Sequence, residues 1–175
     1  MWPTMPTPLV LLTLAVVASR TARGQDSTQC AVTDKDSPLF LNNDGLNACQ
    51  QYQRLRRQCE PSYTVPRLNT ASGSPPDTCS SQGQACCCNN IAFNLAMLCL
   101  SCQTGDHPFA PAGTYKEYLN GCSPELTYKL DAAVQAKVCN TGPSLLRWQY
   151  NMLEPDGSWN YTQIQGVRCA TRGIY

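Results

Sequence analysis

Residues 86–103, CCCNNIAFNLAMLCLSCQ, decide the fold of this chain. Apolar residues occupy nearly the whole circumference of a helix drawn over this stretch, with Ile91 and Leu95 on one side and Met97 on the other. A helix that is apolar all round must be surrounded by the rest of its domain. The stretch therefore predicts a central apolar helix over about residues 89–102.

The same stretch carries five of the twelve cysteines of the chain. Thiols at this density persist as disulfides in an oxidising compartment, so we expect disulfide bonds and an exported protein. Adjacent cysteines bridge each other only with strain, and each member of the Cys86–Cys88 run should therefore reach a different distant partner. Spacing alone leaves the pairing open. The disulfide candidates are Cys30, Cys49, Cys59, Cys79, Cys86, Cys87, Cys88, Cys99, Cys102, Cys122, Cys139 and Cys169.

An apolar leader precedes all of these cysteines. Leu9–Ala18 reads LVLLTLAVVA, which is too short to span a bilayer as a helix but suits the core of a signal peptide. Small residues permit cleavage after Ala18 or after Gly24, and we favour the second site; an uncleaved anchor is the alternative. The predicted divisions are a signal peptide (1–24), an N-terminal extension (25–42) and a disulfide-stapled extracellular domain (43–175).

Composition narrows the class of partner. After removal of the leader with Arg20 and Arg23, the chain has eleven basic and twelve acidic side chains, so its net charge is close to zero. This balance argues against nucleic acid or anionic membrane as the main partner. No later segment has the run of apolar residues that a membrane span needs, so we expect a soluble secreted protein. The remaining length suits one domain whose modest core needs support from disulfides.

Leu46–Cys59 has the apolar stripe of a helix. Arg54 and Arg57 lie away from the stripe, where a solvated face is the ordinary interpretation. A polyanion-binding patch that includes Arg56 is the alternative. The candidate N-caps of this helix are Asn43 and Asp44.

Two further helices are expected after the central one. Thr114 followed by Glu117 forms a capping box at the start of a short helix. Ser123–Pro124 can open the next helix, over Leu126–Val138. Asn69–Gln84 is rich in Ser, Gly and Pro and predicts a loop.

The C-terminal part has the period of a strand. Apolar and polar residues alternate along Leu146–Met152, Glu154–Gly157 is a strong turn signal, and the alternation returns over Trp159–Thr162. We therefore predict a β-hairpin. The fold class is a small disulfide-rich domain that is mainly α with a C-terminal β-hairpin (α+β).

Aromatic rings on one face of this hairpin have two interpretations. They pack in the core, or they stack on the sugar rings of a glycan ligand. The aromatic residues are Trp148, Tyr150, Trp159 and Tyr161. Asn160 opens the glycosylation sequon Asn160–Tyr161–Thr162 and falls on the opposite face, where a glycan would fit.

Several blocks of the chain match the motifs of one family. Asn43–Cys49 with Cys59 is similar to an opening Asn-x-x-Gly…Cys helix, and residues 63–68 are similar to a Val-Pro-x-Leu stretch. Residues 86–103 resemble its block Cys-x-Cys-Asn-x-x-x-Tyr-x-Leu-x-x-x-Cys-x-x-Cys-Gln. The positions that resemble its Trp, Trp, Cys and Trp-Ala-Tyr…Trp residues are Tyr115, Tyr118, Cys122, Trp148, Tyr150 and Trp159.

This family consists of exported cysteine-rich proteins of unknown function from mushroom-forming fungi, many of them predicted single-pass membrane proteins. The resemblance covers about Asn43 to Trp159 and implies an extracytoplasmic ectodomain without a known reaction. The family commonly continues into a transmembrane helix, whereas this chain stops at Tyr175. We therefore expect a secreted variant, or a membrane-anchored protein if the gene model is incomplete at its C-terminus.

Two groups of cysteines resemble redox or metal sites. Cys99 and Cys102 have the Cys-x-x-Cys spacing of redox and zinc sites, but they come at the end of a helix among buried apolar residues, where a thiolate is disfavoured. A zinc site on Cys86–Cys88 would need a second reduced cluster. Neither a catalytic dithiol nor a metal site is predicted.

His107 is the one histidine and lies in a turn-like setting without a nucleophile motif. A pair of glycosidase acids would have to come from any two of four carboxylates, and the sequence does not show the separation that such a pair needs. The four are Asp131, Glu125, Glu154 and Asp156. No catalytic residue and no cofactor is therefore predicted. We expect a non-enzymatic extracellular interaction module whose partner is an extracellular protein or a cell-wall glycan. The alternative is a secreted hydrolase or glycan-binding protein acting at the fungal cell wall.

Overall fold

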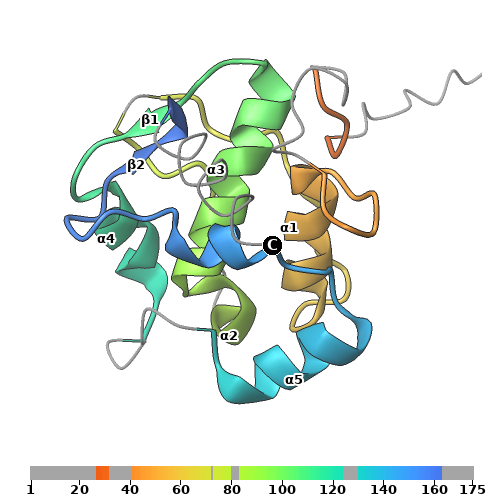
Figure 1. Cartoon of the computed structure of the whole chain (residues 1–175). Helices are drawn as coiled ribbons and strands as arrows, with labels where there is room; N and C mark the ends of the chain where they lie inside the picture. The colour runs from red at the N-terminus through yellow and green to blue at the C-terminus, as the bar shows by residue number, and fades with distance from the viewer. Residues whose placement is uncertain (1–26, 32–40, 72, 80–82, 124–129, 163–175) are drawn as a thin grey trace, which may run out of the picture.

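The computed structural model describes residues 27–31, 41–71, 73–79, 83–123 and 130–162 (Figure 1). It is a small, mainly helical domain with a two-stranded sheet and several disulfides. The elements in chain order are α1 (Ala48–Arg57), α2 (Gln84–Cys87), α3 (Asn90–Thr104), β1 (Phe109–Ala110), α4 (Thr114–Tyr118), the 3-10 helix η1 (Leu119–Gly121), α5 (Ala132–Thr141), the 3-10 helix η2 (Arg147–Asn151) and β2 (Trp159–Asn160).

Helix α3 runs through the middle of the molecule, with α1 on one side and α4 on the other (Figure 1). Its N-cap is Asn89, whose side chain accepts a hydrogen bond from the backbone amide of Ala92 at 2.9 Å. It ends where Gly105 takes a positive φ of 75°, a conformation that costs glycine little. Every residue from Ile91 to Gln103 is buried.

The buried surface of α3 includes polar side chains that bind neighbouring segments. Asn94 donates to the carbonyl of Gln149 at 2.8 Å. Gln103 accepts from the amide of Leu68 at 2.9 Å and donates to the carbonyl of Pro66 at 3.0 Å. The prediction of a central apolar helix over about residues 89–102 is therefore not supported. In the part of the chain that the structure describes, no helix combines the length and apolarity of a membrane span.

Helix α1 packs along α3 through the predicted stripe, and Cys49, Tyr52 and Leu55 are fully buried there. Its N-cap is Asn47, which forms a capping box with Gln50. The predicted caps, Asn43 and Asp44, are wrong. They belong to a preceding turn that is closed by other hydrogen bonds, and the carboxylate of Asp44 accepts from the amide and hydroxyl of Ser144 at 2.8 and 2.7 Å.

The predicted C-terminal β-hairpin is wrong. Residues 147–151 form η2, and β2 pairs instead with β1 in antiparallel register, Phe109 opposite Asn160 and Ala110 opposite Trp159. The carbonyls of Gln149 and Tyr150 accept hydrogen bonds from the side chains of Asn94 and Asn90. These carbonyls are consequently taken by α3 rather than by a strand ladder.

The other two helices also begin away from their predicted starts. Helix α4 has Gly113 as its N-cap, because the hydroxyl of Thr114 donates to the carbonyl of Gly73 instead of capping. Helix α5 is capped by Asp131, whose carboxylate accepts from the amide of Ala133 at 2.8 Å. The first part of the predicted Leu126–Val138 helix lies outside the described residues.

Candidate functional site

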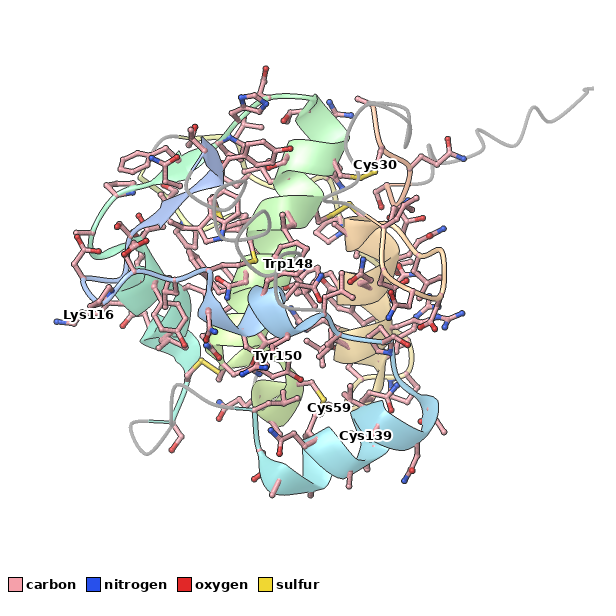
Figure 2. The ribbon with its side chains drawn as sticks, in the orientation of Figure 1. Cys30, Cys59, Lys116, Cys139, Trp148 and Tyr150 are labelled. Atoms are coloured by element: carbon pink, nitrogen blue, oxygen red, sulfur yellow. A yellow bond between two sulfur atoms is a disulfide. The ribbon has the colours of Figure 1, made fainter. Side chains whose placement is uncertain are left out.

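Disulfides are the dominant chemical feature of the described structure, as predicted. Each of the five bridges in the described residues has one cysteine in residues 86–102 and the other in another segment, so α2, its C-cap Cys88 and α3 carry one end of every described crosslink. Cys30 and Cys59 lie toward opposite ends of the molecule (Figure 2). The pairs are Cys30–Cys102, Cys49–Cys99, Cys59–Cys86, Cys79–Cys87 and Cys88–Cys122.

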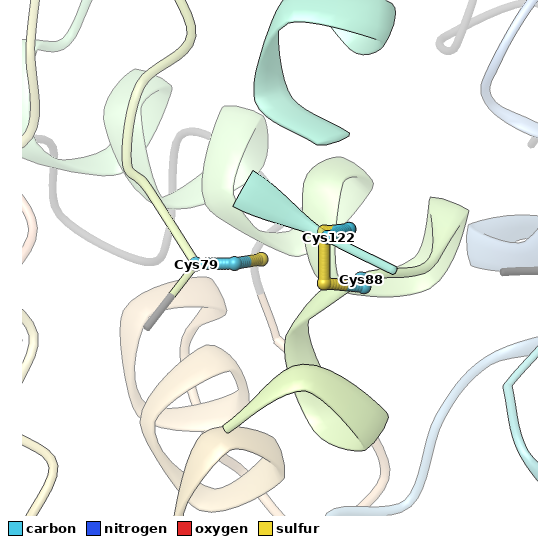
Figure 3. A group of neighbouring side chains, drawn as sticks. All are labelled: Cys79, Cys88 and Cys122. Carbon is cyan, nitrogen blue, oxygen red and sulfur yellow. A yellow bond between two sulfur atoms is a disulfide. The ribbon is translucent and has the colours of Figure 1, made fainter. Parts of the chain in front are cut away.

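The Cys86–Cys88 run reaches three different partners, as expected from the strain of bridging neighbours. It also creates a group in which the sulfurs of Cys79, Cys88 and Cys122 lie within 4.8 Å of one another (Figure 3). Cys88 is bonded to Cys122, and Cys79 to Cys87. Sulfurs in disulfides are not thiolates, so this group forms two neighbouring bridges and not a ligand set for a metal.

The Cys-x-x-Cys motif does not act as one redox pair in this structure. Cys99 is bonded to Cys49 of α1, and Cys102 is bonded to Cys30. Both motif cysteines are fully buried in the last turns of α3. The motif therefore joins two different segments to the C-terminal half of the helix.

Two cysteines remain outside these five bridges. Cys139 is exposed on α5 (Figure 2), and it has no disulfide partner among the described residues. Cys169 lies outside the described part of the chain. The predicted use of these two cysteines in disulfides stays a prediction.

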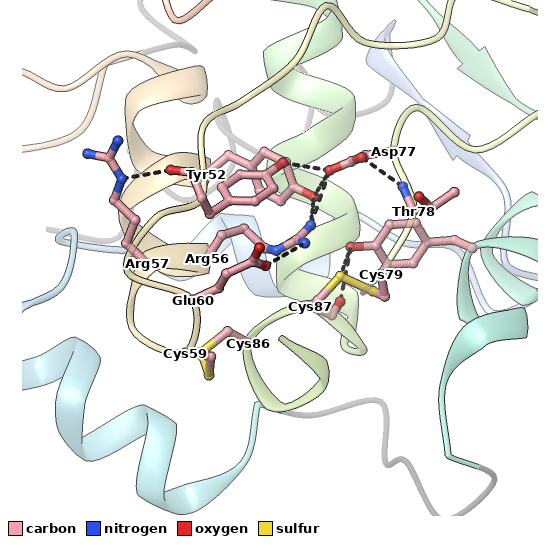
Figure 4. Close-up of polar contacts among 12 residues, drawn as sticks. Tyr52, Arg56, Arg57, Cys59, Glu60, Asp77, Thr78, Cys79, Cys86 and Cys87 are labelled. Carbon is pink, nitrogen blue, oxygen red and sulfur yellow. Dashed lines mark hydrogen bonds and ion pairs between the residues drawn. A yellow bond between two sulfur atoms is a disulfide. The ribbon is translucent and has the colours of Figure 1, made fainter. Parts of the chain in front are cut away.

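A buried charged cluster that was not predicted is built by α1 and the loop before α2 (Figure 4). The guanidinium of Arg56 lies 3.1 Å from Oδ2 of Asp77 and is only 2% exposed. The hydroxyls of Tyr52 and Tyr63 donate to the same carboxylate oxygen at 2.7 and 2.6 Å. We call Tyr52, Arg56, Tyr63 and Asp77 the Arg56 cluster.

Electrostatics fix the protonation of the phenols in this cluster. Burial raises the pKa of Tyr52 and of Tyr63, and the nearby Asp77 carboxylate raises the Tyr63 pKa further. Both phenols therefore keep their protons and donate to Asp77. The guanidinium of Arg56 also lies over the Tyr63 ring, 4.1 Å from its centre, in a cation–π contact.

The Arg56 cluster corrects the interpretation of the α1 arginines. Arg54 and Arg57 are exposed, as expected, but Arg56 is buried and paired, which leaves it unable to join a polyanion-binding patch. One signal in the sequence was the spacing of four between Tyr52 and Arg56, which places both side chains on one face of α1. Asp77 comes from the featureless Asn69–Gln84 loop and carried no such signal.

The aromatic residues proposed for glycan stacking do not share an exposed face. Trp148 comes from η2, and Trp159 and Tyr161 come from β2 and the residues that follow it; all three are buried in the core. Tyr150 is half-buried. Core packing is the interpretation that this burial supports.

The residues considered for hydrolysis have separate local roles. His107 is exposed and stacks on Tyr161, with the ring centres 4.4 Å apart. Asp131 caps α5. Asp156 accepts from the amide of Ser158 at 2.9 Å, and hydrogen bonding with the side chain and then the backbone of Ser158 lowers the pKa of its carboxyl. Glu154 is half-buried in the same turn, and Glu125 lies outside the described residues.

Fold and crosslinks together define the class as a helical domain held by disulfides around one buried helix. Comparison of the chain with protein-family models, with curated proteins and with solved structures finds no match.

Proposed function

We propose that this protein is an exported, non-enzymatic interaction module that presents loops fixed covalently on a buried helix. The observation that carries the proposal is the crosslinking pattern, in which the five bridges of the described residues converge on residues 86–102. Such a pattern suits an oxidising extracellular environment. The leader at residues 1–24 and the resemblance to fungal ectodomains agree with it. The partner would be an extracellular protein or a cell-wall glycan.

The local roles of the acidic residues support a non-enzymatic function. Catalytic acids of glycosidases must face one another across the substrate at a defined separation. The carboxylate of Asp131 instead caps α5, and that of Asp156 accepts a hydrogen bond within a turn. We also propose that Asn160 carries an N-linked glycan, because it opens the sequon of the chain.

Expression in a fungal secretory host tests the proposal in two steps. The protein should appear in the medium with Gln25 as its first residue. When it is denatured without reductant and treated with a thiol-alkylating label, mass spectrometry should find the ten bridged cysteines unlabelled. Label on any of those ten would overturn the crosslinking pattern.

The second step tests for turnover of purified fungal wall polysaccharide. We expect no release of reducing ends above that from a preparation reduced and heat-unfolded beforehand. Release that disappears in a normally secreted Glu154→Gln or His107→Ala protein would contradict the non-enzymatic proposal. Loss of secretion in either variant would mark that residue as structural.

A further inference from the structure

Phe109 is the large apolar side chain left exposed in the part of the chain that the structure describes, with 54% of its surface accessible. It lies in β1, at the edge of the molecule where β1 and β2 run side by side (Figure 1). A single exposed apolar residue is ordinary. What distinguishes Phe109 is the residue opposite it.

The register of the sheet pairs Phe109 with Asn160, the asparagine of the sequon. Residues directly opposite each other in an antiparallel pair have their side chains on the same face, with Cβ atoms roughly 4.5–5.5 Å apart. The other pair, Ala110 and Trp159, is buried. Successive strand residues point to opposite faces, so Phe109 and Asn160 share the outward face.

The orientation of Asn160 is fixed by its surroundings. Trp159 and Tyr161, the residues on either side, are 0% and 3% exposed, and these buried rings hold the segment against the core. The Oδ1 atom of Asn160 accepts from the amide of Thr162 at 2.9 Å. This bond leaves Nδ2, the atom that receives a glycan, without a recorded hydrogen-bond partner among the described residues.

We propose that the first N-acetylglucosamine of a glycan on Asn160 packs its apolar face on the ring of Phe109. This inference rests on the proposed export and glycosylation. During export, Nδ2 forms a bond to C1 of a sugar carried on a lipid diphosphate; the C1–oxygen bond to the diphosphate breaks, and Nδ2 loses one proton. After folding, the strand register brings the attached sugar beside the aromatic ring, where flat apolar surfaces attract.

The test compares proteins secreted by yeast and trimmed with an endoglycosidase that leaves one sugar on asparagine. The variants are the parent, Phe109→Ala, Thr162→Ala, which removes the sequon, and the double variant. When Phe109 is kept, the parent with its single sugar should melt roughly 2–5 °C higher than Thr162→Ala without the sugar, a modest gain for a domain of this size. In the Phe109→Ala background the gain should fall below about 1 °C. Phe109→Trp is the matched control and should retain the gain.

A second readout does not depend on stability. In an NMR spectrum of the trimmed protein, the sugar protons should show nuclear Overhauser contacts to the Phe109 ring and an upfield ring-current shift that Phe109→Ala removes. An equal gain in melting temperature with and without Phe109, or the absence of these contacts, would overturn the stacking. A secreted protein whose Asn160 bears no sugar would overturn the stacking on Phe109 and the proposed glycosylation, but not the proposed export. Failure of export would overturn the proposed function and the stacking together.

Discussion

Replacing Asp77 by asparagine tests whether the Arg56 cluster, rather than the packing around it, holds the loop before α2 against α1. The substitution keeps the size of the side chain and removes one negative charge. Arg56 then stays buried at 2% exposure, and its remaining carboxylate neighbour is Glu60, with an N–O distance of 3.8 Å. A buried cation without a close counter-charge is the costly state.

The magnitude follows from the burial of the two partners. Removing one member of a buried ion pair costs about 3–5 kcal/mol. The Asp77 side chain is 12% exposed and Glu60 partly replaces it, so we expect the low end of that range or less, about 2–3 kcal/mol. For a domain of this size, such a loss lowers the melting temperature by roughly 6–12 °C.

The assay is thermal and urea-induced unfolding of the secreted protein with its disulfides intact. Arg54→Met is the matched control, because it removes an exposed arginine from the same helix and should change the free energy of unfolding by less than about 0.5 kcal/mol. The double variant Arg56→Met with Asp77→Asn should be more stable than Asp77→Asn alone, since no unpaired charge remains buried. An Asp77→Asn protein as stable as Arg54→Met, or a double variant that loses the sum of both changes, would refute the reasoning.

Three other perturbations follow from the same structure. Replacing both cysteines of the Cys49–Cys99 bridge by alanine should lower the free energy of unfolding by about 4 kcal/mol, and the same change at Cys79–Cys87 should lower it by about 2.5 kcal/mol. The difference arises because the two bridges close loops of 50 and 8 residues. Equal losses in urea unfolding would contradict this order. The pKa of Tyr63 is higher in the folded protein than in the unfolded chain, so this phenol stabilises the fold fully below about pH 10, and its contribution is lost as the pH rises above that value. Tyr63→Phe should therefore flatten the alkaline decline of the melting temperature. An unchanged decline would exclude this role. Trp159→Ala should cost about 3–5 kcal/mol and reduce secretion, whereas a normally secreted and equally stable variant would argue against core burial.

Local periodicity predicted the helices that pack in the core. The stripe of Cys49, Tyr52 and Leu55 faces α3 because residues three and four apart share a helix face whatever the tertiary context. The crosslinks followed from composition and compartment in the same way. Their pairing did not, because it depends on where distant segments meet in space.

Caps and strands depended on partners that the local sequence does not contain. Asp44 has the chemistry of an N-cap, but Ser144 binds its carboxylate, and the helix starts at Asn47. Residues 146–152 alternate like a strand, yet Asn94 and Asn90 of α3 take the carbonyls that a ladder would need. Trp148 and Met152 are buried as the alternation requires, but Gln149, which the alternation places on the polar face, is fully buried as well, because a 3-10 helix does not follow the period of a strand.

The distribution of the bridges explains how a domain with a modest hydrophobic core can be stable. Three bridges join α2 and its C-cap, directly before the buried helix α3, to Cys59, Cys79 and Cys122, and two join the end of α3 to Cys30 and Cys49. Crosslinks act mainly by limiting the freedom of the unfolded chain, so their effect is greatest on the segments they enclose. In the described residues none reaches α5 or β2, which depend instead on buried side chains such as Val134, Val138 and Trp159. Within the described residues, disulfides therefore brace the centre around α1 and α3, and buried side chains hold α5 and β2.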